Sequence, residues 1–110
     1  MARFRDGPAF LAAAAADIWV PPANNRARIQ YIHLANVTGA AATFNLYVGA
    51  TGGSAAGTEL FELHSIGAQA EFDHYCDIPQ DTGDFLTGFA SAASTIVILV
   101  TGYLDAVDVT

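Results

Sequence analysis

The sequence predicts an all-β fold: a single antiparallel β-sandwich, jelly-roll-like, with an extended N-terminal arm. Two observations favour it. Segments such as 43–48 and 70–78 alternate apolar and polar residues, which is typical of strands with one buried face. Turn-forming residues separate these segments at the short spacing that all-β domains show. The length of 110 residues suits one domain.

The chain divides into three parts. Residues 1–7 are polar and turn-prone and end at Gly7-Pro8, so we expect an arm there. Residues 8–104 form the sandwich domain, and residues 105–110 form a loose C-terminal tail.

Strands are expected where apolar residues recur at every second position between glycine or proline residues. In order, they cover 17–20, 26–37, 43–48, 59–63, 70–78, a short stretch after the turn at Gly83-Asp84, and a last strand that contains 96–100. Within 26–37 the apolar side chains change face, so we predict a β-bulge at Gln30–Tyr31. Residues 50–57 are small and are expected to form a flexible loop.

The last strand is the most informative segment, because residues 96–100 are apolar at every position. A strand with one solvated face would alternate, so we expect both faces of this strand to be covered. The side chains expected to fill the sandwich are Ile96, Ile98 and Val100, and those expected to face outward are Val97, Leu99 and Tyr103. We expect another copy of the chain to cover the outward set.

Composition also indicates association. Hydrophobic residues make up 53% of the chain and charged residues 14%, against about 25% charged in a typical soluble domain. Such an apolar excess usually marks an association surface. The net charge is −7 without any lysine, so we expect no nucleic-acid partner. No apolar run approaches the roughly 20 residues that span a bilayer, so we expect no membrane partner.

The four arginines are the only basic residues besides histidine, and they fall in two pairs. Arg3 and Arg5 flank Phe4 in the arm. We predict that these three residues dock on a partner, with Phe4 as the anchor and the arginines pairing with carboxylates. Arg26 and Arg28 alternate along a strand and share a face. The alternative for both pairs is solvated or ion-paired surface arginine.

No residue cluster indicates catalysis, so we expect no enzyme activity, metal or cofactor. Turns of small residues hold the serines, which are Ser54, Ser65, Ser91 and Ser94. They lack a nucleophile-elbow pattern, and the histidines are scattered. His74 and Cys76 would point the same way on a strand and suit zinc, with His33 or His64 as further ligands. The interpretation that we favour is core packing for Cys76 and an inward, hydrogen-bonded His74.

An acidic stripe, Glu71, Asp73 and Asp77, alternates along one strand face and could ligate calcium with Asp81 or Asp84. Alternating strand residues lie about 7 Å apart, which suits a solvated or cation-paired face better than a calcium loop. Asp84 is expected to hydrogen-bond turn amides.

Three tyrosines, Tyr31, Tyr47 and Tyr75, face outward in the predicted register. Aromatic faces can stack on sugars, but we favour subunit contacts.

Several short segments occur in an order that resembles small β-sandwich virion proteins of tailed bacteriophages. They are Ile-Trp-Val-Pro-Pro at 18–22, Leu-Ala-Asn at 34–36, Tyr-Val-Gly at 47–49, Gly-Asp-Phe-Leu at 83–86 and Ile-Val-Ile-Leu-Val-Thr-Gly-Tyr at 96–103. The resemblance covers residues 16–104 and brings no catalytic residues with it. The lysine-free, alanine-rich composition resembles that of a phage of a GC-rich host.

The resemblance implies a non-enzymatic capsid decoration, or minor capsid, protein that binds the outer shell and forms a homotrimer. Its partners would be itself, the major capsid protein or other virion proteins. It would be made in the bacterial host cytoplasm and located in the virion, on the capsid surface. A tail or head–tail junction component is the alternative within this class, and a carbohydrate-binding host-attachment module is the alternative of another class.

Overall fold

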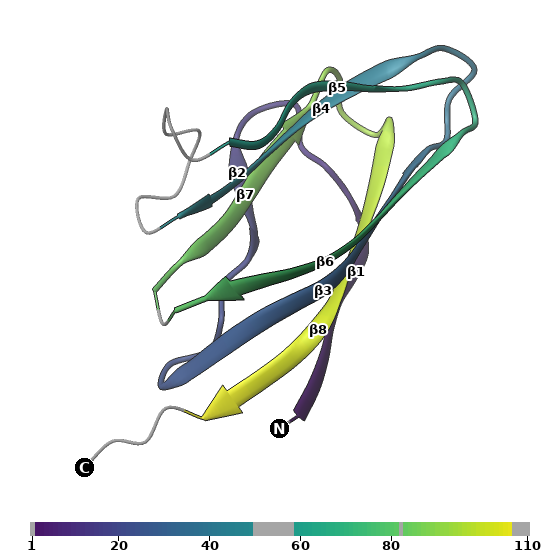
Figure 1. The fold of residues 1–110 in the computed structure, drawn as a ribbon. Helices are drawn as coiled ribbons and strands as arrows, with labels where there is room; N and C mark the ends of the chain where they lie inside the picture. The colour runs from purple at the N-terminus through teal and green to yellow at the C-terminus, as the bar shows by residue number, and fades with distance from the viewer. Residues whose placement is uncertain (1, 50–58, 82, 107–110) are drawn as a thin grey trace.

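The computed structural model describes residues 2–49, 59–81 and 83–106, and this part of the chain is all β, without a helix (Figure 1). Its eight strands are β1 (Ala2–Phe10), β2 (Ala16–Trp19), β3 (Asn25–Asn36), β4 (Ala42–Gly49), β5 (Glu59–Ile66), β6 (Glu71–Gln80), β7 (Phe85–Ala90) and β8 (Ile96–Ala106). The predicted all-β class is confirmed. The expected loop at 50–57 lies outside the described residues.

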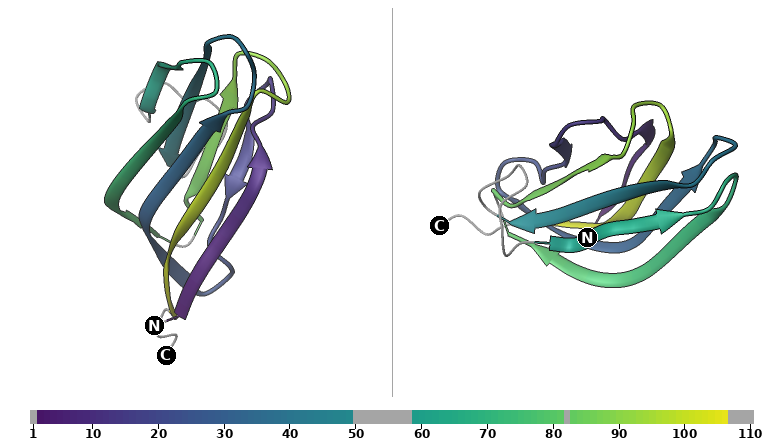
Figure 2. Two further views of the ribbon diagram at one scale, coloured as in Figure 1. Left: turned by 90° about the vertical axis from the view of Figure 1, so that its right-hand side faces the viewer. Right: turned by 90° about the horizontal axis from the view of Figure 1, so that it is seen from above.

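Two four-stranded antiparallel sheets pack face to face (Figure 2). Sheet A has the strand order β1-β8-β3-β6, and sheet B has the order β2-β7-β4-β5. The first strand therefore pairs with the last, the second with the seventh, the third with the sixth, and the fourth with the fifth. This nested pairing is a long hairpin wrapped around a core, which is the jelly-roll arrangement.

Side-chain alternation follows the sequence pattern closely. In β6 the even-numbered residues from Phe72 to Ile78 face the interior, and the odd-numbered residues are exposed. The predicted bulge in β3 is confirmed, because the register with both neighbouring strands shifts between Ile29 and Tyr31. The bulge lets Ile29 and Ile32 both face the core, where each is fully buried.

The core lies between the two sheets and takes inward side chains from every strand. Its fully buried large apolar members are Ile29, Ile32, Leu34, Phe44, Leu46, Leu86, Ile96 and Val100. Gly88 brings two strands close together, because a Cβ at this position would collide with the Asn45 carbonyl oxygen. Ile96, Ile98 and Val100 are all buried, so the inward set that was predicted for the last strand is confirmed.

The N-terminal segment corrects the expectation of a free arm. Residues 2–10 form β1, an edge strand paired with β8 from Ala2 opposite Leu104 to Phe10 opposite Val97. Phe4 is only 9% exposed, and its ring stacks on Trp19 with the centroids 4.3 Å apart. The segment is held because Phe4 fills the core and its backbone completes sheet A.

The C-terminal boundary also differs from the expected tail at 105–110. Strand β8 continues through Ala106, and residues 107–110 lie outside the described residues.

Candidate functional site

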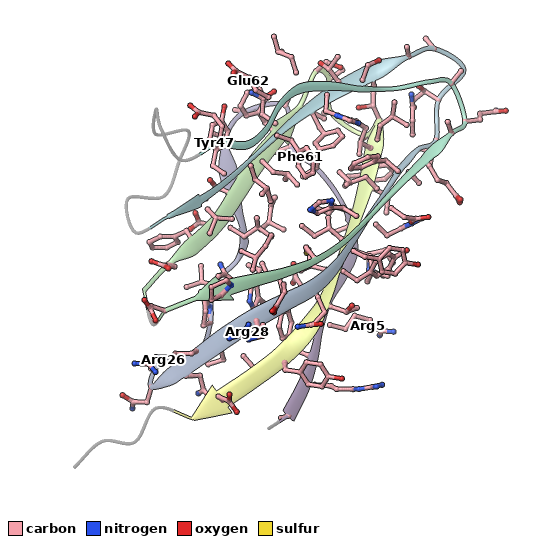
Figure 3. The ribbon with its side chains drawn as sticks, in the orientation of Figure 1. Arg5, Arg26, Arg28, Tyr47, Phe61 and Glu62 are labelled. Atoms are coloured by element: carbon pink, nitrogen blue, oxygen red, sulfur yellow. The ribbon has the colours of Figure 1, made fainter. Side chains whose placement is uncertain are left out.

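The candidate site is the outer face of sheet A, formed by the side chains that alternate with core residues on its four strands (Figure 3). Arg3 lies opposite Tyr103, and Arg5 lies opposite Thr101. Across β8, Thr101 lies opposite Tyr31, which lies opposite Tyr75 on β6. One row of the sheet therefore runs from a basic edge on β1 to an aromatic and acidic edge on β6.

Five of the six residues predicted to contact partners lie on this face: Arg3, Arg5, Val97, Leu99 and Tyr103. The Arg3 guanidinium lies 5.9 Å from the centroid of the Tyr103 ring, a cation–π contact. The sixth residue, Phe4, points the other way into the core, so it does not serve as an anchor for a partner.

One half of the face, which we name the apolar half, consists of Phe10, Ala35, Val97 and Leu99. Phe10, Val97 and Ala35 form one row across three strands, and Phe10 is 54% exposed. Val97 and Leu99 are half-buried at the centre of the sheet. Phe10 was not among the predicted contact residues, because only the pairing of β1 with β8 brings it beside Val97.

The other half, which we name the basic half, consists of Arg3, Arg5, Gln30, Thr101 and Tyr103. These residues come from β1, β3 and β8. Figure 3 shows Arg5 projecting away from the sheet. The halves meet along β8, where the outward residues change from Val97 and Leu99 to Thr101 and Tyr103.

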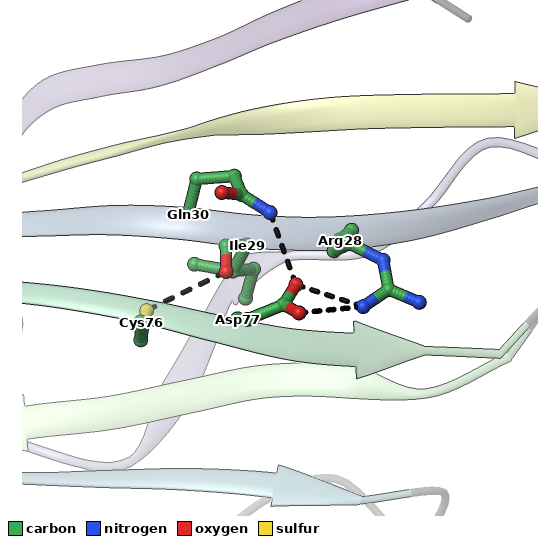
Figure 4. Close-up of polar contacts among 5 residues, drawn as sticks. All are labelled: Arg28, Ile29, Gln30, Cys76 and Asp77. Carbon is green, nitrogen blue, oxygen red and sulfur yellow. Dashed lines mark hydrogen bonds and ion pairs between the residues drawn. The ribbon is translucent and has the colours of Figure 1, made fainter.

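Arg26 and Arg28 both form ion pairs with carboxylates, which was the alternative considered from the sequence. A guanidinium nitrogen of Arg28 lies 2.8 Å from both carboxylate oxygens of Asp77, and Gln30 Nε2 donates to the same carboxylate at 3.0 Å (Figure 4). The hydrogen bond from Arg28 to Asp77 and the charge of that carboxylate raise the pKa of Arg28 above its ordinary value. Arg26 pairs with Asp81 at 3.4 Å.

A second polar group occupies the acidic edge of the face. Tyr31 Oη donates to Asp73 Oδ1 at 2.7 Å, and His33 Nδ1 lies 2.5 Å from the same oxygen. Hydrogen bonds from His33 and then from Tyr31 lower the pKa of the Asp73 carboxyl. The bond to Asp73 raises the pKa of Tyr31 to about 12. Tyr31 therefore stays protonated near neutral pH and is not a ready nucleophile or base.

The outward tyrosines separate into a pair and a single residue. Tyr31 and Tyr75 stack with ring centroids 4.8 Å apart, and Tyr75 is 78% exposed. Tyr47 lies on the other sheet, is only 7% exposed, and packs against Phe89. The sugar platform considered from the sequence therefore has two members on sheet A rather than three.

The residues considered for zinc do not converge. His74 and Cys76 share the inner face, as predicted, whereas His33 belongs to the outer-face group around Asp73. His74 contacts the rings of Phe61 and Phe72, and it does not form the predicted hydrogen bond with any residue that the structure describes. Burial raises the pKa of the Cys76 thiol and so favours its uncharged form.

Among the residues that the structure describes, four of the five carboxylates considered for calcium, all except Glu71, have local partners instead. Asp73 and Asp77 accept the hydrogen bonds described above, and Asp84 Oδ2 accepts one from the Asp81 amide, as predicted. Within the described residues, no three side chains of His, Cys, Asp or Glu gather to hold a metal ion. Ser91 Oγ accepts a hydrogen bond from the Thr43 amide, and Ser54 lies outside the described residues.

A scan against known protein families found no match, and a search of curated proteins found none. Across the part of the chain that the structure describes, no helix has the length and apolar character to cross a membrane.

Proposed function

We propose that this chain is a non-enzymatic structural protein of a tailed-phage virion, namely a capsid decoration protein that binds the outer shell and associates as a trimer. Jelly-roll sandwiches build many viral capsid proteins, which is compatible with this role. A fold alone does not assign a function, so the proposal depends on the surface that the fold presents.

The observation that carries the proposal is the apolar half of the outer face of sheet A. An antiparallel sheet commonly packs one face on the core and presents polar residues to water on the other. Here Val97 and Leu99 continue the apolar character of β8 onto the outer face, and Phe10 beside Val97 is 54% exposed. Charged side chains from β6 lie at one margin of this surface. An apolar centre with a polar rim is the usual composition of a protein–protein interface.

The polar chemistry of the face also favours a structural role. The Tyr31–Asp73–His33 group and the Arg28–Asp77 pair are each held by hydrogen bonds among their own side chains. Such groups fix strand register and solubility without leaving an activated nucleophile.

The proposal is tested by comparing Leu99→Asp with Leu63→Asp. Leu63 lies on sheet B, is 68% exposed and has a φ of 49°, a conformation that Asp tolerates, so its variant should keep the native mass and fold. Leu99→Asp should weaken self-association at least about 100-fold, because burying an unpaired carboxylate costs several kcal/mol. Sedimentation equilibrium measures the mass, and circular dichroism checks the fold. A folded Leu99→Asp protein with unchanged mass would contradict self-association through this surface.

Capsid binding needs a separate measurement. Purified protein mixed with undecorated capsids should bind to saturation in a fixed ratio to the major capsid protein, and its copy number per virion should be high. A low copy number confined to one vertex or to the tail would favour a tail or head–tail junction component instead.

A further inference from the structure

The four arginines of this acidic chain differ in whether they form ion pairs. Arg26 and Arg28 each form an ion pair with an aspartate. Among the described residues, Arg3 and Arg5 form none, and both side chains are exposed on β1. A chain with a net charge of −7 thus keeps its two unpaired arginines side by side on one strand face.

These arginines border a hollow of about 500 Å³ on the basic half. The other residues that line it are Phe4, Gln30, Thr101, Gly102 and Tyr103. A Cβ on Gly102 would collide with the Arg28 carbonyl oxygen and the Phe4 ring on the inner side of the sheet, so this position requires glycine. The volume falls within the range of about 300–1,000 Å³ typical of small-molecule sites.

The residues that line the hollow suit a ligand that carries both an anionic group and hydroxyl groups. Among the described residues, no carboxylate lines the hollow, while two guanidinium groups do. Guanidinium binds carboxylate through paired hydrogen bonds. Thr101 offers a hydroxyl, and Gln30 keeps its carbonyl oxygen for a donor while its nitrogen binds Asp77. The Tyr103 ring, which has the Arg3 guanidinium over one face, supplies an apolar wall of the kind that packs against a sugar ring.

We infer that this hollow binds a sugar that carries a carboxylate, either free or as the acidic residue of a glycan. The overall charge of −7 repels extended polyanions, so a ligand with a single acid group suits the site better than a nucleic acid does. The inference adds ligand binding to the proposed assembly role and does not depend on it, because different residues carry it.

The test uses the full-length, ¹⁵N-labelled protein and three probes: D-glucuronate, its uncharged analogue D-glucose, and acetate as a bare carboxylate. Two-dimensional amide spectra should show saturable shifts at Thr101 and Gly102 with glucuronate. Affinity for glucose and for acetate should each be at least about tenfold weaker, since each lacks one half of the recognised chemistry. Glucuronate attached to a neutral oligosaccharide distinguishes a glycan terminus from the free sugar.

Arg5→Gln should reduce glucuronate affinity about tenfold or more. Arg26→Gln is the matched control, because it removes the same charge from the same sheet outside the hollow and should change the affinity less than about twofold. Equal affinities for acetate and glucuronate would overturn the claim that the hollow recognises a sugar and would indicate a site for a simple anion. Binding that survives Arg5→Gln, or no saturable shift at millimolar glucuronate, would overturn the inference altogether. The sedimentation assay on Leu99 is unaffected by any of these results.

Discussion

Strand β1 can be tested through Phe4, whose burial decides whether the N-terminal segment is an arm or part of the fold. Phe4→Ala removes a ring that is 9% exposed and that stacks on Trp19 with an interplanar angle of 4°. A phenylalanine buried in this way costs about 3–5 kcal/mol when truncated to alanine. Loss of the aromatic stack is part of that cost.

Phe10→Ala is the matched control, because it makes the same substitution on the same strand at a ring that is 54% exposed. Burying such a side chain fully contributes about 1.5–3 kcal/mol, and Phe10 is about half buried. We therefore expect Phe10→Ala to lower the free energy of unfolding by about 1 kcal/mol. With a urea m-value of about 1.5 kcal/mol/M, the Phe4 variant should unfold at least about 2 M earlier and the Phe10 variant less than about 1 M earlier.

Urea unfolding of both variants can be followed by circular dichroism, with the fluorescence of the only tryptophan, Trp19, as a second probe. If the two variants lose the same small stability, Phe4 is not a core residue and the segment behaves as an arm. If Phe4→Ala alone is strongly destabilised, deletion of residues 2–6 should damage the sandwich as well.

Two further predictions concern polar groups. The absorbance change that marks ionisation of Tyr31 should appear only near pH 12, and Asp73→Asn should return it toward the ordinary value of about 10 in a spectrophotometric titration. Since folding raises this pKa, the stabilisation is complete below about pH 10 and is lost as the pH rises to about 12. Both polar side-chain atoms of Gln80, which is 1% exposed, lack a hydrogen-bond partner among the described residues. Gln80→Met should therefore raise the free energy of unfolding by about 1 kcal/mol, and a lower urea midpoint would refute that reasoning.

Local pattern was enough to predict much of this fold. The alternation in 70–78 gave the inward and outward sets of β6, because a strand repeats every two residues whatever it pairs with. The change of face in β3 predicted the bulge for the same reason. Asp84 was predicted from the turn that contains it, and its partner is only three residues away.

Pairing between distant segments could not be predicted in this way. Strand β1 pairs with β8, which lies more than 80 residues away in the chain. The only large apolar residue on the inward face of β1 is Phe4, which stands between two arginines in the sequence. The alternation Arg-Phe-Arg is too short to distinguish a strand from an arm. The hollow beside Arg5 was invisible for the same reason, since its walls come from three strands that only the jelly-roll pairing brings together.

The apolar run in β8 can be covered in two ways, by neighbouring strands within one copy and by a second copy of the chain, and the experiments must separate these two contributions. Strand β8 lies inside sheet A with β1 and β3 on either side, so neighbouring side chains already cover part of Val97 and Leu99 within one copy. Some stability lost in Leu99→Asp will therefore arise in the monomer, whether or not the chain associates. The mass of the Leu99→Asp protein, measured by sedimentation under conditions in which the variant is still folded, reports only the contact between copies. That measurement, and not the unfolding midpoint, decides whether the apolar half is an assembly surface.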